Sequence, residues 1–315
     1  MRYKVFVDGQ EGTTGLKIHE RLERRNDIEM LQIDPEKRKD PSERSTLLNE
    51  ADVAFLCLPD AAARESVSLV NNPHTRIIDA STAHRTAEGW TYGFPELSPA
   101  HREALKTSKR VSVPGCHATG FLLSVYPLVK EGILSPDYPV TSHSISGYSG
   151  AGKKMIEVYE SAGRDDKELK SPRFYALGLA HKHLPEMKKV GGLNHYPLFT
   201  PIIGDYYQGM SVAVPLYSRL LKKHLTAKEL QSFFAEYYKG QQFVSVPETG
   251  PDNYPGNGYL SATALNGTNN IELFVTGHDE QMLLVSRLDN LGKGASGAAV
   301  QCMNIMLGME EERGL

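Results

Sequence analysis

The stretch Val7-Asp8-Gly9-Gln10-Glu11-Gly12-Thr13-Thr14-Gly15 follows a β-rich run, Tyr3–Val7, and precedes a charged helical pattern that contains Ile18 and Leu22. Glycines between a strand and a helix allow a tight turn and let a pyrophosphate approach the backbone at the helix start. The spacing is Gly-x-x-Gly-x-x-Gly rather than the common Gly-x-Gly-x-x-Gly, so a plain strand–helix turn is the alternative. Because the loop lies in the first such unit, we predict a dinucleotide-binding domain.

The alternation of strand and helix continues after this loop. Further β-rich or apolar runs occur at Glu29–Ile33, Ala51–Leu58, Arg76–Ala80 and Arg110–Val113. Ala51–Leu58 is apolar almost throughout, as in a parallel strand buried on both faces. Strands that alternate with helices predict a parallel, doubly wound sheet.

The pattern changes after Cys116, where a helical pattern covers Phe121–Val129. Longer alternating segments follow at Thr141–Ser146, Gly209–Leu216, Gln242–Val246, Tyr259–Asn266 and Asn270–Gly277, with helices near Lys153–Glu160, Thr226–Tyr238 and Ala295–Leu307. We interpret Asn266–Asn270 as a hairpin turn. The predicted fold class is α/β, with a doubly wound parallel-sheet domain and an α+β domain that holds a mixed or antiparallel sheet. The predicted domains are a dinucleotide-binding domain (1–115), a catalytic domain (116–285) and a C-terminal loop and helix (286–315) that returns to the first domain.

The composition is that of a globular protein. The chain has 315 residues, a net charge of −3, 40% hydrophobic and 23% charged residues, which gives no electrostatic reason to expect nucleic acid or a membrane as partner. No apolar run approaches the ~20 residues that span a bilayer. Because the chain enters a strand directly, we expect no signal peptide. Cys57, Cys116 and Cys302 match neither a disulfide framework nor a zinc motif, so we expect a reducing cytoplasm.

One of these cysteines occupies a special position, in Val113-Pro114-Gly115-Cys116-His117-Ala118-Thr119-Gly120. It stands where a helix begins, and the N–H groups and partial positive charge of a helix start favour thiolate over thiol. A buried structural cysteine is the alternative. We predict that Cys116 is a nucleophile and that Cys57 and Cys302 belong to the core.

The block His181-Lys182-His183-Leu184-Pro185-Glu186 is the best source of a base for this thiol. An imidazole that takes the thiol proton and is oriented by a carboxylate is the usual way to activate a cysteine. A metal site is disfavoured because no further cysteine or histidine stands at ligand spacing. We expect the imidazole of His181 or of His183 near Cys116 Sγ, and the sequence leaves the choice open. His117 is adjacent to Cys116, but neighbouring side chains at a helix start point apart.

A second glycine loop spans Ser144–Lys154 and nearly matches Gly-x-x-x-x-Gly-Lys-[Ser/Thr]. Lys154 replaces the magnesium-binding hydroxyl, which argues against a nucleotide triphosphatase. The loop predicts a site for a substrate phosphate or carboxylate, with a structural turn as the alternative. Near the first loop, Asp34 lies where a ribose-binding acid is usual, whereas Glu36-Lys37-Arg38-Lys39 offers cations for a 2′-phosphate. These residues leave NAD and NADP open.

Together these parts indicate one reaction class. A thiolate attacks an activated acyl group, phosphate leaves a thioester behind, and hydride reduces the thioester to an aldehyde. A cysteine hydrolase would not need the Gly9–Gly15 loop. A non-catalytic dinucleotide-binding sensor would need neither Cys116 nor the His181–Glu186 block.

The chain resembles the N-acetyl-gamma-glutamyl-phosphate reductase family, in its short form (type 2), over nearly its whole length. The resemblance rests on Gly9–Gly15, Asp79–Arg85, Gly93–Leu97, Pro114–Thr119, Ser149–Gly152, His181–Glu186 and Asp289–Gly294. It implies NADP-dependent reductive dephosphorylation of N-acetyl-glutamyl 5-phosphate to N-acetyl-glutamate 5-semialdehyde, a step of arginine biosynthesis. It also implies a cytoplasmic homo-oligomer, a dimer or tetramer.

The resemblance further implies roles for individual residues. The catalytic residues would be Cys116 and one of His181 and His183. The cofactor would be bound by Gly9, Gly12, Thr13, Thr14, Gly15, Ser149, Gly150, Asn290, Lys293 and Gly294. The substrate would be bound by Ser81, Arg85, His117, Lys153 and Glu186, and no metal is implied.

Three features depart from the longer form of the family, namely His117 in place of a tyrosine, the pattern Ser81–Arg85, and Gln10-Glu11 in the glycine loop. An aspartate-semialdehyde dehydrogenase is a rival, but it normally carries Asn-Cys where this chain has Gly115-Cys116. A reductase of N-acetyl-aminoadipyl phosphate differs by one methylene, which is worth only ~1–3 kcal/mol of discrimination. This second rival stays open.

Overall fold

The computed structural model describes residues 2–161, 166–250 and 253–315. The described residues divide into two compact units, at Gly115/Cys116 and again at Gly294/Ala295. Unit 1 combines the N-terminal part with Ala295–Leu315, and unit 2 is Cys116–Gly294. The sequence predicts that the C-terminal segment begins at residue 286, whereas in the structure unit 1 resumes at Ala295. The functional roles of the two units stay predictions at this point.

Unit 1 contains a six-stranded sheet in the order β2-β1-β3-β4-β6-β5, in which every neighbouring pair is parallel. Its strands are β1 (Tyr3–Asp8), β2 (Ile28–Leu31), β3 (Val53–Leu56), β4 (Arg76–Asp79), β5 (Thr91–Tyr92) and β6 (Arg110–Ser112). From β1 the chain adds β2 on one side and β3 on the other, so the strand order reverses at β1. Ligands bind at such a reversal in open parallel sheets. The predicted doubly wound sheet is confirmed.

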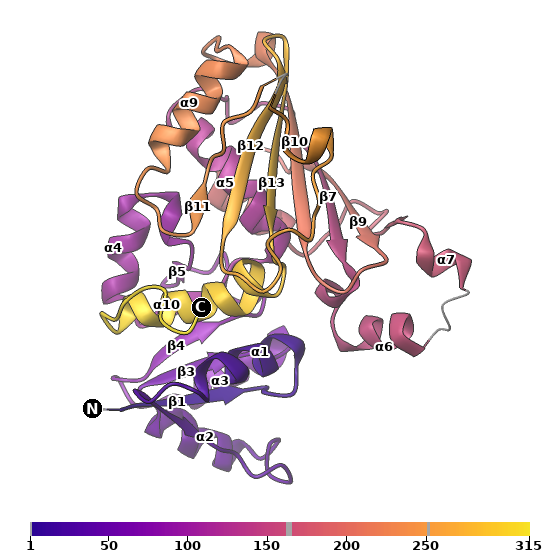
Figure 1. Ribbon diagram of the computed structural model, residues 1–315. Coiled ribbons are helices and arrows are strands. Elements are labelled where there is room, and N and C mark those ends of the chain that lie inside the picture. Colours follow the sequence, from indigo (N-terminus) through magenta and orange to yellow (C-terminus); the bar gives the residue numbers. More distant parts are fainter. Residues whose placement is uncertain (1, 162–165, 251–252) are drawn as a thin grey trace. The chain divides into compact units, whose positions relative to one another are not determined.

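Helices cover both faces of this sheet (Figure 1). They are α1 (Thr13–Leu22), α2 (Pro41–Glu50), α3 (Asp60–Leu69), α4 (Pro99–Thr107) and α10 (Gly297–Met306). Ile18 and Leu22 of α1 share one apolar core with Val300 and Met303 of α10. Leu48 of α2 belongs to a second core, together with residues of α3. Burial on both faces explains why β3 is apolar at every position.

Unit 2 contains a seven-stranded mixed sheet in the order β11-β12-β13-β10-β7-β9-β8. Its strands are β7 (Thr141–Gly147), β8 (Arg173–Phe174), β9 (Leu198–Gly204), β10 (Met210–Tyr217), β11 (Val244–Ser245), β12 (Ile271–His278) and β13 (Gln281–Leu288). The pairs β7–β9 and β11–β12 are parallel, and the other pairs are antiparallel. The predicted mixed sheet is confirmed.

Helix α5 (Cys116–Lys130) packs on this sheet and places Cys116 at its first position. A Cβ at Gly120 would lie 2.6 Å from both Ser286 Oγ and Val212 Cγ2, so the helix approaches β10 and β13 closely. The Ser286 hydroxyl also donates to the Gly120 carbonyl at 3.0 Å. The remaining helices of the described part of unit 2 are α6 (Lys153–Ser161), α7 (Lys167–Lys170), α8 (Leu184–Gly191) and α9 (Ala227–Tyr237). The predicted helices near 121–129, 153–160 and 226–238 are therefore confirmed.

Two predictions for this unit are wrong. Tyr259–Asn266 is not a strand but a series of turns, and β12 and β13 form the hairpin through Asp279 and Glu280 instead. Tyr259 is 83% exposed, and the Ser261 hydroxyl accepts the Thr263 backbone N–H, so local turn bonds replace sheet pairing there. Strands β8, β9 and β13 lie outside the predicted segments.

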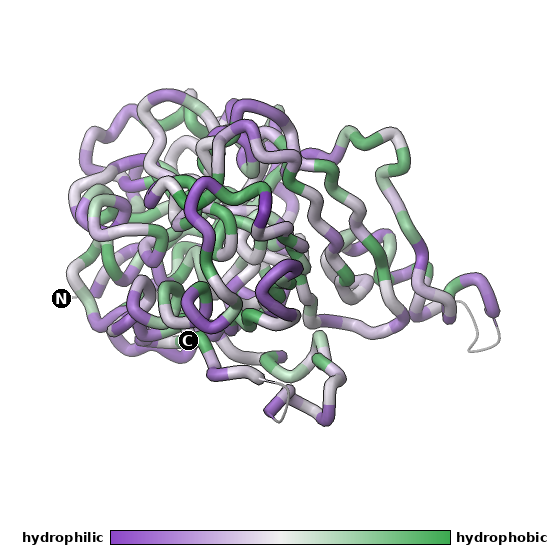
Figure 2. Tube along the Cα trace, turned by 90° about the horizontal axis from the view of Figure 1, so that it is seen from above, coloured by the Kyte–Doolittle hydropathy of each residue, from purple (hydrophilic) through white to green (hydrophobic). Residues whose placement is uncertain are grey.

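Among the described residues no helix is long and apolar enough to cross a membrane. Figure 2 shows hydrophilic residues mainly in the outer turns and hydrophobic residues mainly in the packed elements. This distribution agrees with the burial of the strands and of α5 and α10.

Candidate active site

The first glycine loop is a tight turn between β1 and α1. Gly9 has φ +88°, and a Cβ there would lie 2.4 Å from the Cys57 carbonyl oxygen. A Cβ at Gly15 would lie 2.5 Å from the Gly9 carbonyl oxygen. The Gly12 N–H donates to the same carbonyl at 3.1 Å. Packing alone therefore requires glycine at positions 9 and 15.

The start of α1 also fits a pyrophosphate. Gly12 is the N-cap and has no side chain to cap the helix, so the first N–H groups of α1 are available to a ligand. Asp8 precedes the loop, but its carboxylate is buried and pairs with Arg44 at 3.1 Å. The Ser66 hydroxyl donates to the same carboxylate at 2.8 Å. Asp8 is thus neutralised by its own neighbours, and the loop remains suited to an anion.

The turn after β2 brings a cation to this loop. Arg38 forms an ion pair with Glu11, which is part of the glycine loop. Asp34 accepts the Glu36 backbone N–H at 2.9 Å and so stabilises the turn that carries Arg38. The cations predicted to receive a 2′-phosphate therefore include one whose side chain already reaches the loop.

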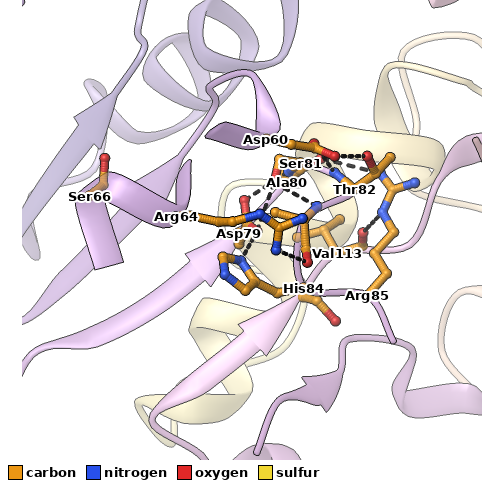
Figure 3. Close-up of polar contacts among 12 residues, drawn as sticks. Asp60, Arg64, Ser66, Asp79, Ala80, Ser81, Thr82, His84, Arg85 and Val113 are labelled. Carbon is orange, nitrogen blue, oxygen red and sulfur yellow. Dashed lines mark hydrogen bonds and ion pairs between the residues drawn. The ribbon is translucent and has the colours of Figure 1, made fainter. Parts of the chain in front are cut away.

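The Asp79–Arg85 segment is a hydrogen-bonded loop of unit 1 (Figure 3). Asp79 is buried and accepts the Ser81 N–H at 2.9 Å and the Ser81 hydroxyl at 2.8 Å. Its second oxygen also lies 2.6 Å from His84 Nδ1. Arg85 donates to the carbonyls of Val113, at 2.9 Å, and Ala80, at 3.2 Å. These contacts assign Ser81 and Arg85 a part in shaping the loop, and substrate binding by them stays a prediction.

Cys116 differs from the other two cysteines in its surroundings. Its side chain is half-buried at the start of α5. A Cβ at Gly294 would lie 2.7 Å from Cys116 Cβ, so the loop that follows β13 lies against this residue. Cys302 is buried and lies 3.4 Å from the Gly93 carbonyl. Burial, followed by the charges of Asp79 and Asp8, raises the pKa of the Cys57 thiol and makes its thiolate unfavourable.

His117 lies at the centre of a cluster of hydrogen-bonding side chains. Its Nδ1 is 2.7 Å from Ser144 Oγ, and its Nε2 is 2.8 Å from the Tyr175 hydroxyl. The ring centroids of His181 and His183 lie 5.3 and 5.4 Å from that of His117. Burial and then the Cys116 charge raise the pKa of Tyr175, whose hydroxyl adjoins His117. The structure therefore brings together His117 and both candidate bases in the vicinity of Cys116.

The two candidate bases are coupled to each other. The His183 backbone N–H donates to His181 Nδ1 at 3.1 Å, and the two ring centroids are 4.6 Å apart. With Nδ1 as acceptor, neutral His181 carries its proton on Nε2. Glu186 is buried in the first turn of α8. Among the described residues no group of three or more histidine, cysteine or acidic side chains is placed to hold a metal ion.

Burial makes His117 a neutral residue. Desolvation, helped by the charges of His181 and Lys182, lowers the pKa of His117 from 6.5 to about 3. A neutral ring holds one N–H, so His117 donates to one of Ser144 and Tyr175 and accepts from the other. The direction of the Tyr175 hydroxyl therefore depends on which ring nitrogen of His117 holds the proton.

This pKa gives a prediction for stability against pH. Below 6.5 the unfolded chain protonates His117 and the folded chain does not until about 3, so stability falls as the pH drops through this window. The slope is at most about 1.4 kcal/mol per pH unit. We expect the free energy of unfolding to fall more steeply in the wild type than in His117→Asn between about pH 6 and pH 4. Urea unfolding measures this, with the exposed His224→Asn as control, and parallel curves for wild type and His117→Asn would contradict it.

The backbone of the second glycine loop forms hydrogen bonds within unit 2. The N–H groups of Gly147, Tyr148 and Ser149 donate to the carbonyls of Gly209, Tyr206 and Tyr207. These three donors are therefore not available to an anion. Lys153 is exposed at the start of α6.

The loop after β13 contacts the second glycine loop. The Asn290 side chain donates to Ser149 Oγ at 3.1 Å and accepts the Gly209 N–H at 2.7 Å. Lys293 is buried, with Nζ 5.6 Å from the centroid of the Phe243 ring. A Cβ at Gly150 would lie 3.2 Å from Asn290 Nδ2. Ser149, Gly150, Asn290, Lys293 and Gly294 thus belong to unit 2, whereas the first glycine loop belongs to unit 1.

Sequence reasoning missed two members of the cluster, Tyr175 and Ser144. Ser144 could have been found, because β7 alternates and the serines 142, 144 and 146 all face inward. Tyr175 lies in a segment without a motif, in which Ala176 and Leu179 have φ of +52° and +53°. No sequence signal identifies it.

Comparisons with known proteins find relatives over nearly the whole chain. A family model described as "Semialdehyde dehydrogenase, NAD binding domain" matches residues 4–107, and one described as "Semialdehyde dehydrogenase, dimerisation domain" matches residues 116–290. The chain is 51% identical to "N-acetyl-gamma-glutamyl-phosphate reductase 2" of Nostoc sp. over 99% of both chains. It is 46% identical to the protein of that name from Pseudomonas putida over 98% of both.

Solved structures share the fold at low sequence identity. Aspartate semialdehyde dehydrogenase II of Vibrio cholerae superimposes with a TM-score of 0.73 and 15% identity, over 98% of this chain and 99% of that one. Aspartate semialdehyde dehydrogenase of Candida albicans, solved with NADP, gives 0.66 and 14% over 98% and 99%. By the near-full-length identity to its relatives, the chain belongs to the N-acetyl-gamma-glutamyl-phosphate reductase family.

Proposed function

We propose that this protein reduces N-acetyl-gamma-glutamyl phosphate to N-acetylglutamate 5-semialdehyde with NADPH, through a thioester on Cys116. The observation that carries the proposal is the position of Cys116 at the start of α5, beside the cluster of His117, Tyr175, His181 and His183. The identity of 51% over 99% of a relative named for this reaction supports the substrate.

The residues of unit 2 account for the acyl-transfer half of the reaction. The start of α5 favours the thiolate of Cys116, and His181 or His183 receives its proton. The thiolate forms a bond to the acyl carbon, the bond from that carbon to the phosphate oxygen breaks, and phosphate leaves with its electron pair. NADPH, when bound, supplies the hydride that reduces the thioester. As the sulfur–carbon bond breaks, the aldehyde leaves, and the protonated imidazole returns its proton to the Cys116 sulfur.

The proposal is tested in the reverse direction. We expect reduction of NADP by N-acetylglutamate 5-semialdehyde to require phosphate and to yield the acyl phosphate. The semialdehyde with one more methylene, the N-acetyl-aminoadipate analogue, is the competitor to compare by kcat/KM. Activity that is independent of phosphate would contradict the reaction, and a higher kcat/KM for the longer semialdehyde would assign the other substrate.

For the cofactor, the cation at the glycine loop favours NADP over NAD. Arg38 reaches Glu11 from the turn after β2, where a 2′-phosphate is usually bound. We expect Arg38→Ala to lower kcat/KM for NADPH by about 10- to 100-fold, the value of a charge-assisted hydrogen bond, and to leave NADH nearly unchanged. Steady-state kinetics with both cofactors measure this, with the exposed Arg24→Ala as control. An equal loss with both cofactors would show that Arg38 does not bind the 2′-phosphate.

The sheet of unit 2 supports assembly into a homo-oligomer. Val212 and Ser286 face α5, whereas Ile145, Ala213 and Pro215 alternate onto the opposite face and are only partly buried. Apolar side chains that stay partly exposed on a sheet face support an interaction surface. We expect light scattering at micromolar concentration to give the mass of at least two chains, and a monomer mass would contradict this.

A further inference from the structure

A cavity of about 230 Å³ lies within unit 2, at the second glycine loop. Its walls include the apolar side chains of Met155 and Ile203 and the ring of Tyr175. Ser146 and Arg173 supply the polar part of its lining. The cavity thus combines an apolar surface with one cationic side chain.

Tyr175 connects this cavity to the proposed nucleophile. The residue lines the cavity, and its hydroxyl lies 2.8 Å from His117 Nε2. His117 follows Cys116 directly in the chain. The cavity is thus linked through Tyr175 and His117 to the segment that carries Cys116.

Arg173 is a cation without an acidic partner among the described residues. Its Nη2 donates to the Tyr159 hydroxyl at 2.8 Å, and the guanidinium lies 5.4 Å from the centroid of that ring. Its Nε is buried and has no hydrogen-bond partner in the described part of the chain. A buried donor on a charged group that lacks a partner is unfavourable, and an anion would satisfy it.

Two shielded arginines of unit 1 show what is missing at Arg173. Arg44 pairs with Asp8 at 3.1 Å and with Glu65 at 3.0 Å. Arg25 pairs with Asp27 at 2.8 Å. At Arg173 the neutral phenol of Tyr159 takes the place of a carboxylate, so the planar fork of the guanidinium remains suited to a carboxylate from outside the chain.

We propose that this cavity binds the non-reacting end of the acyl substrate and that Arg173 binds its α-carboxylate. This inference rests on the proposed function, because it assumes an acyl group on Cys116. The acetamido group would lie against the apolar wall of Met155 and Ile203. Arg173 would then select substrates that carry a carboxylate, and it would leave the phosphate site unaffected.

The test compares two aldehydes in the phosphate-dependent direction, N-acetylglutamate 5-semialdehyde and 4-acetamidobutanal, which lacks only the α-carboxylate. We expect the wild type to prefer the first by about 30- to 100-fold in kcat/KM. Arg173→Met should raise KM for the first by a similar factor, change kcat little, and abolish the preference. Arg173→Lys should restore part of it.

Arg219→Met is the matched control, because Arg219 lies 5.1 Å over the Tyr217 ring at the surface. It should behave as the wild type, and equal melting temperatures show that both variants fold. A preference that survives in Arg173→Met, or a rise in KM for phosphate alone, would overturn the assignment of Arg173. A wild type without phosphate-dependent activity would instead overturn the proposed function and this inference with it.

Discussion

Replacing Cys116 with serine should lower kcat for both directions of the reaction by about 10⁴-fold or more, the scale of losing a catalytic nucleophile. A serine hydroxyl does not ionise in the pH range where a thiol at a helix start does, so residue 116 would no longer attack the acyl group. Steady-state kinetics measure the loss. Binding of the cofactor should be unchanged, because the first glycine loop belongs to unit 1.

Cys302→Ala is the matched control for this variant. Cys302 is buried in α10 of unit 1, so its replacement should affect stability modestly and leave kcat nearly unchanged. Full activity of Cys116→Ser would contradict covalent catalysis by this residue. Loss of activity in Cys302→Ala with an unchanged melting temperature would also contradict it, because the essential thiol would then be that of Cys302.

Replacing Gly9 with alanine should have the largest effect in unit 1. The change forces a side chain into φ +88° and places its Cβ 2.4 Å from the Cys57 carbonyl oxygen. The backbone conformation costs ~1–2 kcal/mol and the overlap about 1–3 kcal/mol more. We expect a loss of about 2–5 kcal/mol in the free energy of unfolding, and weak binding of the cofactor. Denaturant unfolding and fluorescence titration with NADPH measure the two effects.

Two other glycines serve as controls that separate the effect of backbone conformation from those of steric overlap and cofactor approach. Gly89 has φ +77° and open space around its Cα, so Gly89→Ala should cost only about 1 kcal/mol. Gly12 has φ −74°, and a Cβ there would be 3.5 Å from its nearest neighbour, so Gly12→Ala should fold normally. If a pyrophosphate approaches this backbone, Gly12→Ala should still weaken NADPH binding, by about 10-fold. Equal stability of Gly9→Ala and Gly89→Ala would contradict the account of the loop.

Much of unit 1 could be predicted because local signals and topology agree there. All strands of the parallel sheet except β5 overlap predicted β-rich or apolar runs, and Gly9 and Gly15 are required by close contacts of the loop. In unit 2 the sheet depends on pairings between distant segments. The exposed turns at Tyr259–Asn266 have the alternation of a strand, and the partner that would have made them one is absent from the described residues.

The candidate site was predictable only in part, for a similar reason. Cys116 and the His181–Glu186 block carry local signals, such as a helix start and paired imidazoles. Tyr175 carries none, and its role follows from a contact with His117 that only the folded chain creates. Arg173 likewise carries no sequence signal. It stands out only because no carboxylate of the described residues pairs with it in the folded chain.

The central claim is a thioester on Cys116, and mass spectrometry of the intact protein tests it most directly. The protein is mixed with N-acetyl-gamma-glutamyl phosphate without NADPH and quenched in acid. We predict that one N-acetylglutamyl group is added per chain, that peptide mapping places it on Cys116, that one phosphate is released, and that Cys116→Ser gains nothing. Phosphate release without an adduct, or an adduct that persists in Cys116→Ser, would contradict the account.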